Sequence, residues 1–141
     1  MRYVFRKGCL LSRDERGLAA LEFVLVAPIL IFLVFGTMRV GYMFGVQNSL
    51  SQLASQAARI ALPERDSARR ESVVRTYVSR SAKDYAFLDA RRVDVVFQEE
   101  DGRAIISVNM DVSQVPSVPF LAAIYEFPRV QTARAVIGVQ E

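Results

Sequence analysis

The chain of 141 residues contains no histidine and a single cysteine, Cys9. Without histidine, a Ser-His or Cys-His catalytic arrangement cannot form, and neither can a metal site built on imidazole. One cysteine allows neither an intramolecular disulfide nor a multi-cysteine metal site. Carboxylate chemistry is the route to catalysis that stays open, and we expect no cofactor.

Most of the chain has no excess of charge of either sign, although the formal net charge is +3. Of the 18 basic and 15 acidic residues, five basic and two acidic ones precede Leu18, which leaves 13 of each sign after it. The basic excess therefore lies in a short tail before an apolar run, the pattern that places residues 1–17 in the cytoplasm. No nucleic-acid partner is expected. The five basic residues are Arg2, Arg6, Lys7, Arg13 and Arg16.

The apolar run covers residues 18–38, where the only ionisable side chain is that of Glu22. As a helix these 21 residues are about 31 Å long, which matches a hydrocarbon core of roughly 30 Å. We therefore predict one transmembrane helix. Residues 1–17 are unlike a secretory signal peptide, because their small-residue cut-site candidate, Gly17, precedes the apolar core instead of following it.

Helical periodicity continues past the span through residues 39–62 and stops before Pro63. One helix of about 67 Å is predicted over 18–62, apolar all round at first and amphipathic later. Residues 39–62 would be its extracytoplasmic continuation. Its apolar stripe consists of Met43, Val46, Leu50, Leu53, Ala57 and Ala61.

A second helix is predicted over residues 67–88 from an apolar stripe with the same period. On its wet side, Glu71 with Arg75 and Arg80 with Asp84 have the spacing of ion pairs one helical turn apart.

Further along the chain the period changes to two. Residues 93–98 and 103–112 alternate as strands on either side of Asp101-Gly102, a strong hairpin turn, and 130–139 is a third strand.

Together these elements predict an α+β head over residues 63–141, with a three-stranded antiparallel sheet covered by the outer half of the long helix. Residues 120–127 would be a short helical or loop excursion. Solvated hairpin and strand positions explain the acidic side chains of the head better than catalysis does: Asp94, Glu99, Glu100, Asp101 and Asp111.

The stretch "GLAALEF" resembles the processing site of type IV prepilins. The resemblance implies that a membrane prepilin peptidase cuts after Gly17 on the cytoplasmic side. Leu18 would become the new first residue, and Glu22, followed by Phe23, would help to stack subunits.

The longer stretch "RGLAALEFVLVAPILIFLVFG" is similar to the TadE-like pseudopilins of the Flp (tight adherence) pilus system, although its signature does not separate TadE-like from TadF-like members. This resemblance implies a minor pilin-like protein in the bacterial inner membrane, single-pass, with a cytoplasmic N-terminus and a periplasmic head. Its partners would be prepilin peptidase, other pilin or pseudopilin subunits, the pilus assembly machinery and membrane lipid. The signature residues are Arg16, Gly17, Ala19, Glu22, Phe23, Pro28 and Gly36.

Each motif residue also has a plainer interpretation. Gly17 lets an extended backbone enter a protease cleft, or it is a flexible joint. Glu22 pairs with the new α-ammonium group of a neighbouring subunit, or it is an acid tolerated at the membrane interface. Pro28 kinks or opens the helix, or it is a proline that membrane helices tolerate. Gly41 and Gly45 form a small-xxx-small pair for close helix packing, or share that spacing by chance.

Two other kinds of protein compete with the pilin-like hypothesis. One is an unprocessed, membrane-anchored periplasmic module that recruits another envelope protein. The other, disfavoured by the absent histidines, is a membrane-anchored enzyme.

Overall fold

The computed structural model describes residues 15–115 and 128–139, which divide into two units between Val34 and Phe35. We call the residues up to 34 the anchor and those from 35 onward the head. Nearly all of the predicted leader lies outside the described residues, and so does the predicted excursion at 120–127.

The first element, α1 (Glu15–Ala61), is a single α-helix of 47 residues that contains Pro28. It confirms the prediction of one long helix. The helix begins three residues before Leu18, and it ends at Ala61, just before the turn that contains Pro63.

The second helix, α2 (Ser67–Ser81), starts where the sequence predicts but is shorter than the predicted 67–88. The side chain of Asp66 caps it by accepting a hydrogen bond from the Arg69 amide at 3.0 Å. After Ser81 the chain tightens into a short 3₁₀ turn, η1 (Ala82–Asp84). The prediction of a helix to residue 88 was wrong, because the chain leaves the helical path to place the Leu88 side chain in the core from a turn.

The two ion pairs predicted on this helix have different outcomes. Arg75 and Glu71 form their pair, with 2.7 Å between Nη2 and Oε1. Arg80 and Asp84 do not form their predicted ion pair in the described structure. Asp84 lies in η1, where three residues per turn move it off the four-residue spacing that such a pair needs.

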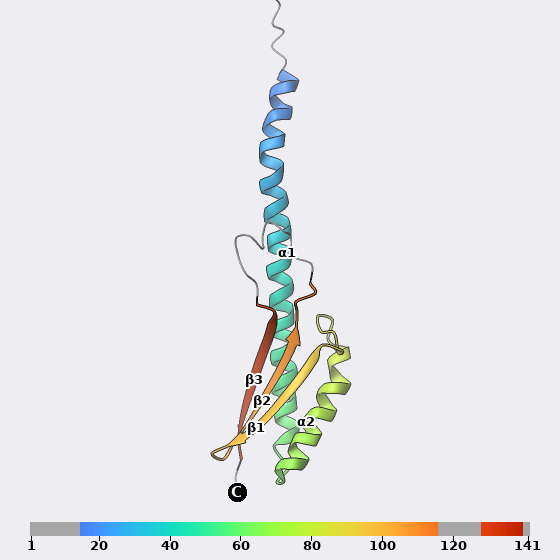
Figure 1. Ribbon diagram of the computed structural model, residues 1–141, viewed down its shortest axis with the longest axis vertical. Coiled ribbons are helices and arrows are strands. Elements are labelled where there is room, and N and C mark those ends of the chain that lie inside the picture. The colour runs from blue at the N-terminus through green and yellow to red at the C-terminus, as the bar shows by residue number, and fades with distance from the viewer. Residues whose placement is uncertain (1–14, 116–127, 140–141) are drawn as a thin grey trace, which may run out of the picture. The chain divides into compact units, whose positions relative to one another are not determined.

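Three antiparallel strands form the sheet in the order β1-β2-β3 (Figure 1): β1 (Val93–Glu100), β2 (Arg103–Asp111) and β3 (Val130–Gly138). Asp101 (φ 50°) and Gly102 (φ 68°) both have left-handed conformations, as the tightest hairpin turn between β1 and β2 requires. The predicted α+β fold is confirmed.

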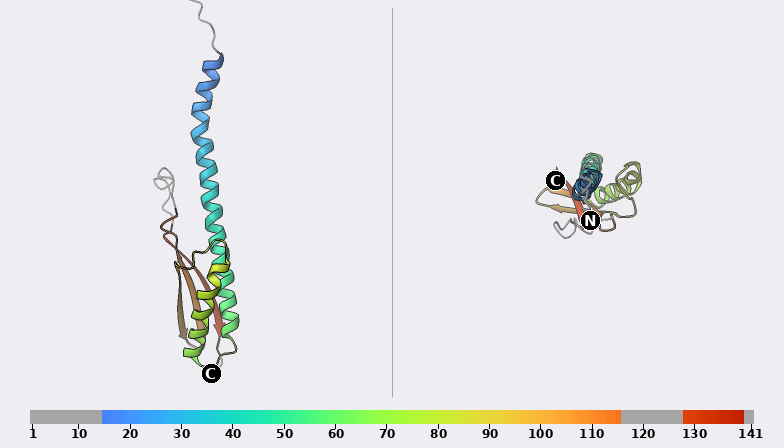
Figure 2. Two further views of the ribbon diagram at one scale, coloured as in Figure 1. Left: turned by 90° about the vertical axis from the view of Figure 1, so that its right-hand side faces the viewer. Right: turned by 90° about the horizontal axis from the view of Figure 1, so that it is seen from above.

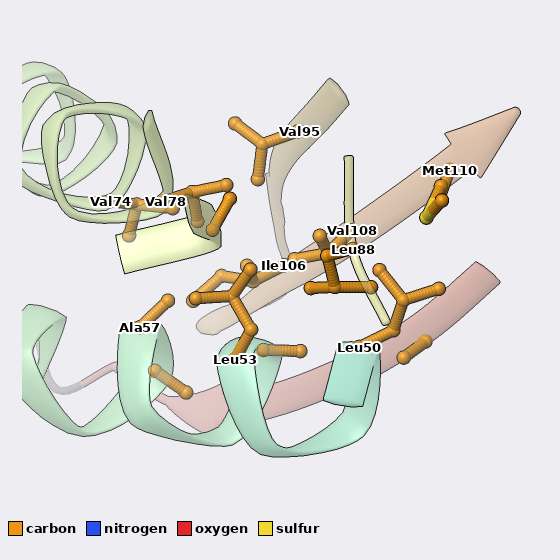
Figure 3. Packing of buried hydrophobic residues seen from close by; sticks show 14 of the residues in the cluster. Leu50, Leu53, Ala57, Val74, Val78, Leu88, Val95, Ile106, Val108 and Met110 are labelled. Carbon is orange, nitrogen blue, oxygen red and sulfur yellow. The ribbon is translucent and has the colours of Figure 1, made fainter. Parts of the chain in front are cut away.

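One face of the sheet is covered by α2 and by the part of α1 that belongs to the head (Figure 2). Side chains on β2 alternate between fully buried and half-buried, so the period of two marks the covered face. Figure 3 shows the core where the two helices meet the sheet. Its members include Val46, Leu50, Leu53, Ala57, Val74, Val78, Leu88, Val95, Ile106, Val108 and Met110.

Helix side chains also bond to the two edge strands. Gln47 Nε2 of α1 donates to the Thr132 carbonyl of β3 at 3.3 Å, and Arg75 Nη1 of α2 donates to the Val95 carbonyl of β1 at 3.1 Å. Each bond occupies a backbone acceptor of an edge strand, where an unpaired backbone invites pairing with another chain.

Candidate functional site

The anchor exposes its large apolar side chains on all sides. Leu25 is 67% exposed, and no part of the most apolar stretch of α1 is buried within the described part of the chain. A core helix of a soluble protein would have a covered face. By length and composition, α1 contains one candidate membrane anchor whose apolar surface is not covered by the described part of the chain.

Gly17 and Leu18, the predicted cleavage site, lie in the first turns of α1. A side chain at Gly17 would meet nothing within 4 Å, so the position is open from outside. The sequence places Gly17 ahead of the helix, whereas the structure places it inside. The first amides of a helix have no intrahelical acceptor, and glycine costs about 1 kcal/mol relative to alanine in a helix, so this end is the easiest to unwind.

Glu22 and Phe23, the predicted stacking residues, are both exposed on α1. The helical neighbours of Glu22 are Leu18, Leu25 and Val26, so its carboxylate stands on an otherwise apolar surface. No hydrogen bond or ion pair joins Glu22 to another described residue. Its carboxylate is therefore available to a second molecule.

Pro28 lies inside α1, which continues through it as one helix. Its ring nitrogen cannot donate to the Val24 carbonyl, so one helical hydrogen bond is missing in the anchor. The predicted kink stays a prediction.

Gly41 and Gly45, the predicted packing pair, have different surroundings in the head. A side chain at Gly41 would meet nothing within 4 Å. A Cβ atom at Gly45 would lie 3.0 Å from the ring of Phe87, which also makes an edge-to-face contact with Tyr42 at a centroid distance of 6.1 Å. Gly45 is thus covered by a side chain of the same chain, and only Gly41 presents an open backbone surface.

The burial of Arg70 was not predicted from the sequence, yet only 2% of the residue is exposed. Its guanidinium group donates to the carbonyls of Glu64 and Arg65, each at 2.9 Å, and to Glu99 Oε2 at 2.6 Å. These bonds join the start of α2, the turn before it and the end of β1. We call this set of contacts the Arg70 clamp.

Glu99 is the acidic partner in the Arg70 clamp. Hydrogen bonds from the Ser67 hydroxyl, at 2.7 Å, and from Arg70 hold the pKa of the Glu99 carboxyl below its ordinary value, and the positive charge of Arg70 lowers it further. A sequence signal for the clamp existed, since Arg70 precedes Val74 by four residues and so continues the buried stripe of α2.

A hollow of about 350 Å³ lies beside the Arg70 clamp. Each of the three guanidinium nitrogens already donates a hydrogen bond within the chain. Across residues 15–115 and 128–139, no three carboxylate, cysteine or histidine side chains gather as a metal-binding group. The hollow is lined by Leu62, Pro63, Glu64, Arg65, Arg70, Ile137, Gly138 and Val139.

Comparison with known protein families finds a match for most of α1. Residues 17–59 match the family described as TadE-like protein. The segment is TadE-like. The match begins at Gly17 and extends into the part of α1 that packs in the head.

The TadE-like match confirms, for residues 17–59, the resemblance inferred from the sequence. TadE-like proteins form a structural, non-enzymatic family. Neither a curated protein nor a solved structure matches the chain.

Proposed function

We propose that this chain is a minor pilin-like protein of a Flp (type IVb) pilus, made as a precursor and cut after Gly17 by a prepilin peptidase. The observation that carries the proposal is the TadE-like match, which begins at Gly17. The residues that follow form an exposed apolar helix with one acidic side chain, Glu22. Such a surface suits a subunit that leaves lipid to pack against other subunits during pilus biogenesis.

The distribution of charge supports an orientation in the bacterial inner membrane. Basic residues are in excess only before Leu18, so the N-terminus would stay in the cytoplasm and the head would lie in the periplasm. In this orientation residues 18–38 span the bilayer, residues 39–62 continue the helix outside it, and the head occupies 63–141. The leader, residues 1–17, is then on the side where the resemblance puts the peptidase.

Cleavage creates a new charge beside Glu22. The α-ammonium group of Leu18 would stand four residues, or about 6 Å of helix rise, from Glu22. In a poorly solvated surface each group stabilises the ionised form of the other. Glu22 lies near the end of the span, so leaving it unpaired costs less than the roughly 2.5–3.5 kcal/mol of a charge at the centre of a span. Pairing between copies therefore favours one axial offset of neighbouring subunits over others.

The direct test of processing is the N-terminus of the mature protein. Mass spectrometry of the chain purified from membranes of pilus-producing cells should find Leu18 as the first residue. The Gly17→Ala variant should retain the longer precursor, whereas Gly41→Ala, a glycine with equally open surroundings, should be cut normally. Wild-type chains that still begin at Met1 in such cells would contradict the proposal.

A second candidate is the unprocessed, membrane-anchored binding module. It is favoured by exposed apolar side chains on the open face of the sheet, where Val96 and Val136 lie away from both helices. The double variant Gly17→Ala with Glu22→Ala separates the two hypotheses. Loss of pilus assembly and adherence is expected for a pilin-like protein, and full retention of both would favour the binding module.

A further inference from the structure

One end of the head collects exposed apolar and basic side chains. This end, which we call the proximal end, is the one from which α1 runs toward its N-terminus. It includes residues 38–45 of α1, the connection 82–92 between α2 and β1, the end of β2 and the start of β3 (Figures 1 and 2).

Aromatic side chains lie on two sides of α1 at the proximal end. Phe44 is 72% exposed, whereas Val46, two residues later, is fully buried in the core. Phe87 reaches α1 from the connection, packs over Gly45 and against Tyr42, and still leaves 45% of its surface exposed. Phe44 and Tyr42 are two residues apart, so they lie on opposite sides of the helix. We call these three rings, which lie on two sides of α1, the aromatic belt.

The height of this belt matches a membrane interface. Met38 ends the apolar run, and Phe44 follows it by about 9 Å of helix rise, Tyr42 by about 6 Å. The headgroup layer on each side of a bilayer is roughly 5–8 Å thick, and aromatic rings concentrate there. Rings held at this height lie in or directly above the headgroups.

The charge of the proximal end suits an anionic surface. Among the described residues it carries five basic and three acidic side chains, and one acid, Asp89, pairs with two of the basic ones, Arg91 and Arg92. By contrast, the hairpin at the opposite end is acidic through Glu99, Glu100 and Asp101. The proximal side chains are Arg39, Lys83, Arg91, Arg92 and Arg129, with Asp84, Asp89 and Asp111.

We propose that the proximal end of the head rests on the membrane surface. Phe44 and Phe87 enter the headgroup layer, and Lys83 and Arg129 face anionic phospholipids. The proposal rests on the proposed insertion of residues 18–38. A lipid surface is the occupant because the exposed aromatic rings follow the apolar run along α1, with the exposed Met38 and Val40 between them.

The absence of tryptophan allows a direct test, because any introduced tryptophan is the only one in the chain. The full chain would carry Phe87→Trp or Phe44→Trp and be reconstituted into phosphatidylcholine–phosphatidylglycerol vesicles brominated near the top of the acyl chain. Phe35→Trp marks the span, and Val136→Trp, on the open face of the sheet, marks the aqueous head. Quenching at positions 44 and 87 should be at least threefold stronger than at position 136.

Charge reversal tests the electrostatic part. Lys83→Glu with Arg129→Glu should reduce quenching of the reporter at position 87 at least twofold in anionic vesicles. Arg65→Glu with Arg103→Glu, the matched change at the opposite end, should leave it unchanged. Equal effects of the two pairs would overturn the role of proximal charge.

Quenching at position 87 no stronger than at position 136, with strong quenching at position 35, would overturn the proposal and leave pilin processing untouched. Absent quenching at position 35 would overturn membrane insertion itself, and with it both proposals. The measurement requires neither cleavage nor pili, so an uncut precursor does not affect its outcome.

Discussion

The two halves of α1 differ both in their share of apolar side chains and in the surroundings of those side chains. In the anchor, Leu25 is 67% exposed, and in the head, Leu53 is fully buried. Residues 18–34 are apolar on every side except at Glu22. Residues 46–61 reserve one side for Ser, Gln and Arg. An amphipathic helix buries its apolar stripe against the rest of its chain, whereas a helix that is apolar all round needs lipid or a large core around it.

This contrast separates two sources of stability. The head gains stability from its own core, to which α1 contributes side chains from Val46 to Ala61. The anchor makes no such core, so its apolar surface gains stability only from lipid or from neighbouring subunits. The same substitution should therefore change the free energy of unfolding of the head when it is made in the head, and should leave it nearly unchanged when it is made in the anchor.

The largest expected effect follows from removing a buried side chain. Leu53→Ala should lower the free energy of unfolding of the head by about 2–5 kcal/mol, because it leaves a cavity among α1, α2 and the sheet. Leu25→Ala, the same change in the anchor, should alter this free energy by less than about 0.5 kcal/mol. Urea unfolding in detergent, followed by far-ultraviolet circular dichroism, measures both.

Equal losses in the two variants would mean that the anchor also contributes to a core, which would remove the distinction between the halves. A loss of unfolding free energy in Leu53→Ala that is smaller than expected, but still larger than in Leu25→Ala, would show that the core relaxes into the cavity.

The stability of the head should also depend on pH, because a carboxyl group in the head has a shifted pKa. The pKa of Glu99 is lowered in the folded head by hydrogen bonds from Ser67 and Arg70, so the unfolded chain takes up a proton more readily. The stability contributed by Glu99 is fully present above the ordinary glutamate pKa of about 4.3, and it is lost as pH falls through the lower folded value. The head should therefore lose stability on acidification below about pH 5.

Glu99→Gln should reduce the stability of the head at pH 7 and flatten its dependence on pH between about 5 and 3. Part of the slope should remain, because hydrogen bonds from Arg91 and Ser113 also lower the pKa values of Asp89 and Asp111. Glu100→Gln is the matched control, since Glu100 neighbours Glu99 and makes none of these bonds in the described structure. A wild-type slope in Glu99→Gln would show that the Arg70 clamp is not the titrating element.

Local chemistry made much of the fold predictable. Asp101-Gly102 admits few turns other than a tight hairpin, and the alternation from Ile106 to Met110 identifies the covered face of β2. The anchor was predictable because the length of its apolar run matches the thickness of a hydrocarbon core. These features depend on residues close together in the sequence.

Features that depend on distant residues were missed. Apolar spacing continues through Leu88, so the pattern alone could not show that α2 ends at Ser81. The contact between Phe87 and Gly45 joins residues 42 positions apart, and the bond between Arg70 and Glu99 joins residues 29 apart. Such pairings arise only when the sheet and both helices pack together.

The smallest expected effect compares the two glycines of the predicted packing pair. Gly41→Ala should stabilise the head by about 0.5–1 kcal/mol, because alanine is the better helix former and its Cβ atom meets open space. Gly45→Ala has the same helical gain, but its Cβ atom would stand 3.0 Å from the Phe87 ring and would force the ring aside. Gly45→Ala should therefore be the less stable variant by about 1 kcal/mol. Combining each change with Phe87→Ala isolates the cause: the difference between the two glycine positions should disappear once the ring is absent, and its persistence would place the cost in the backbone of α1 instead.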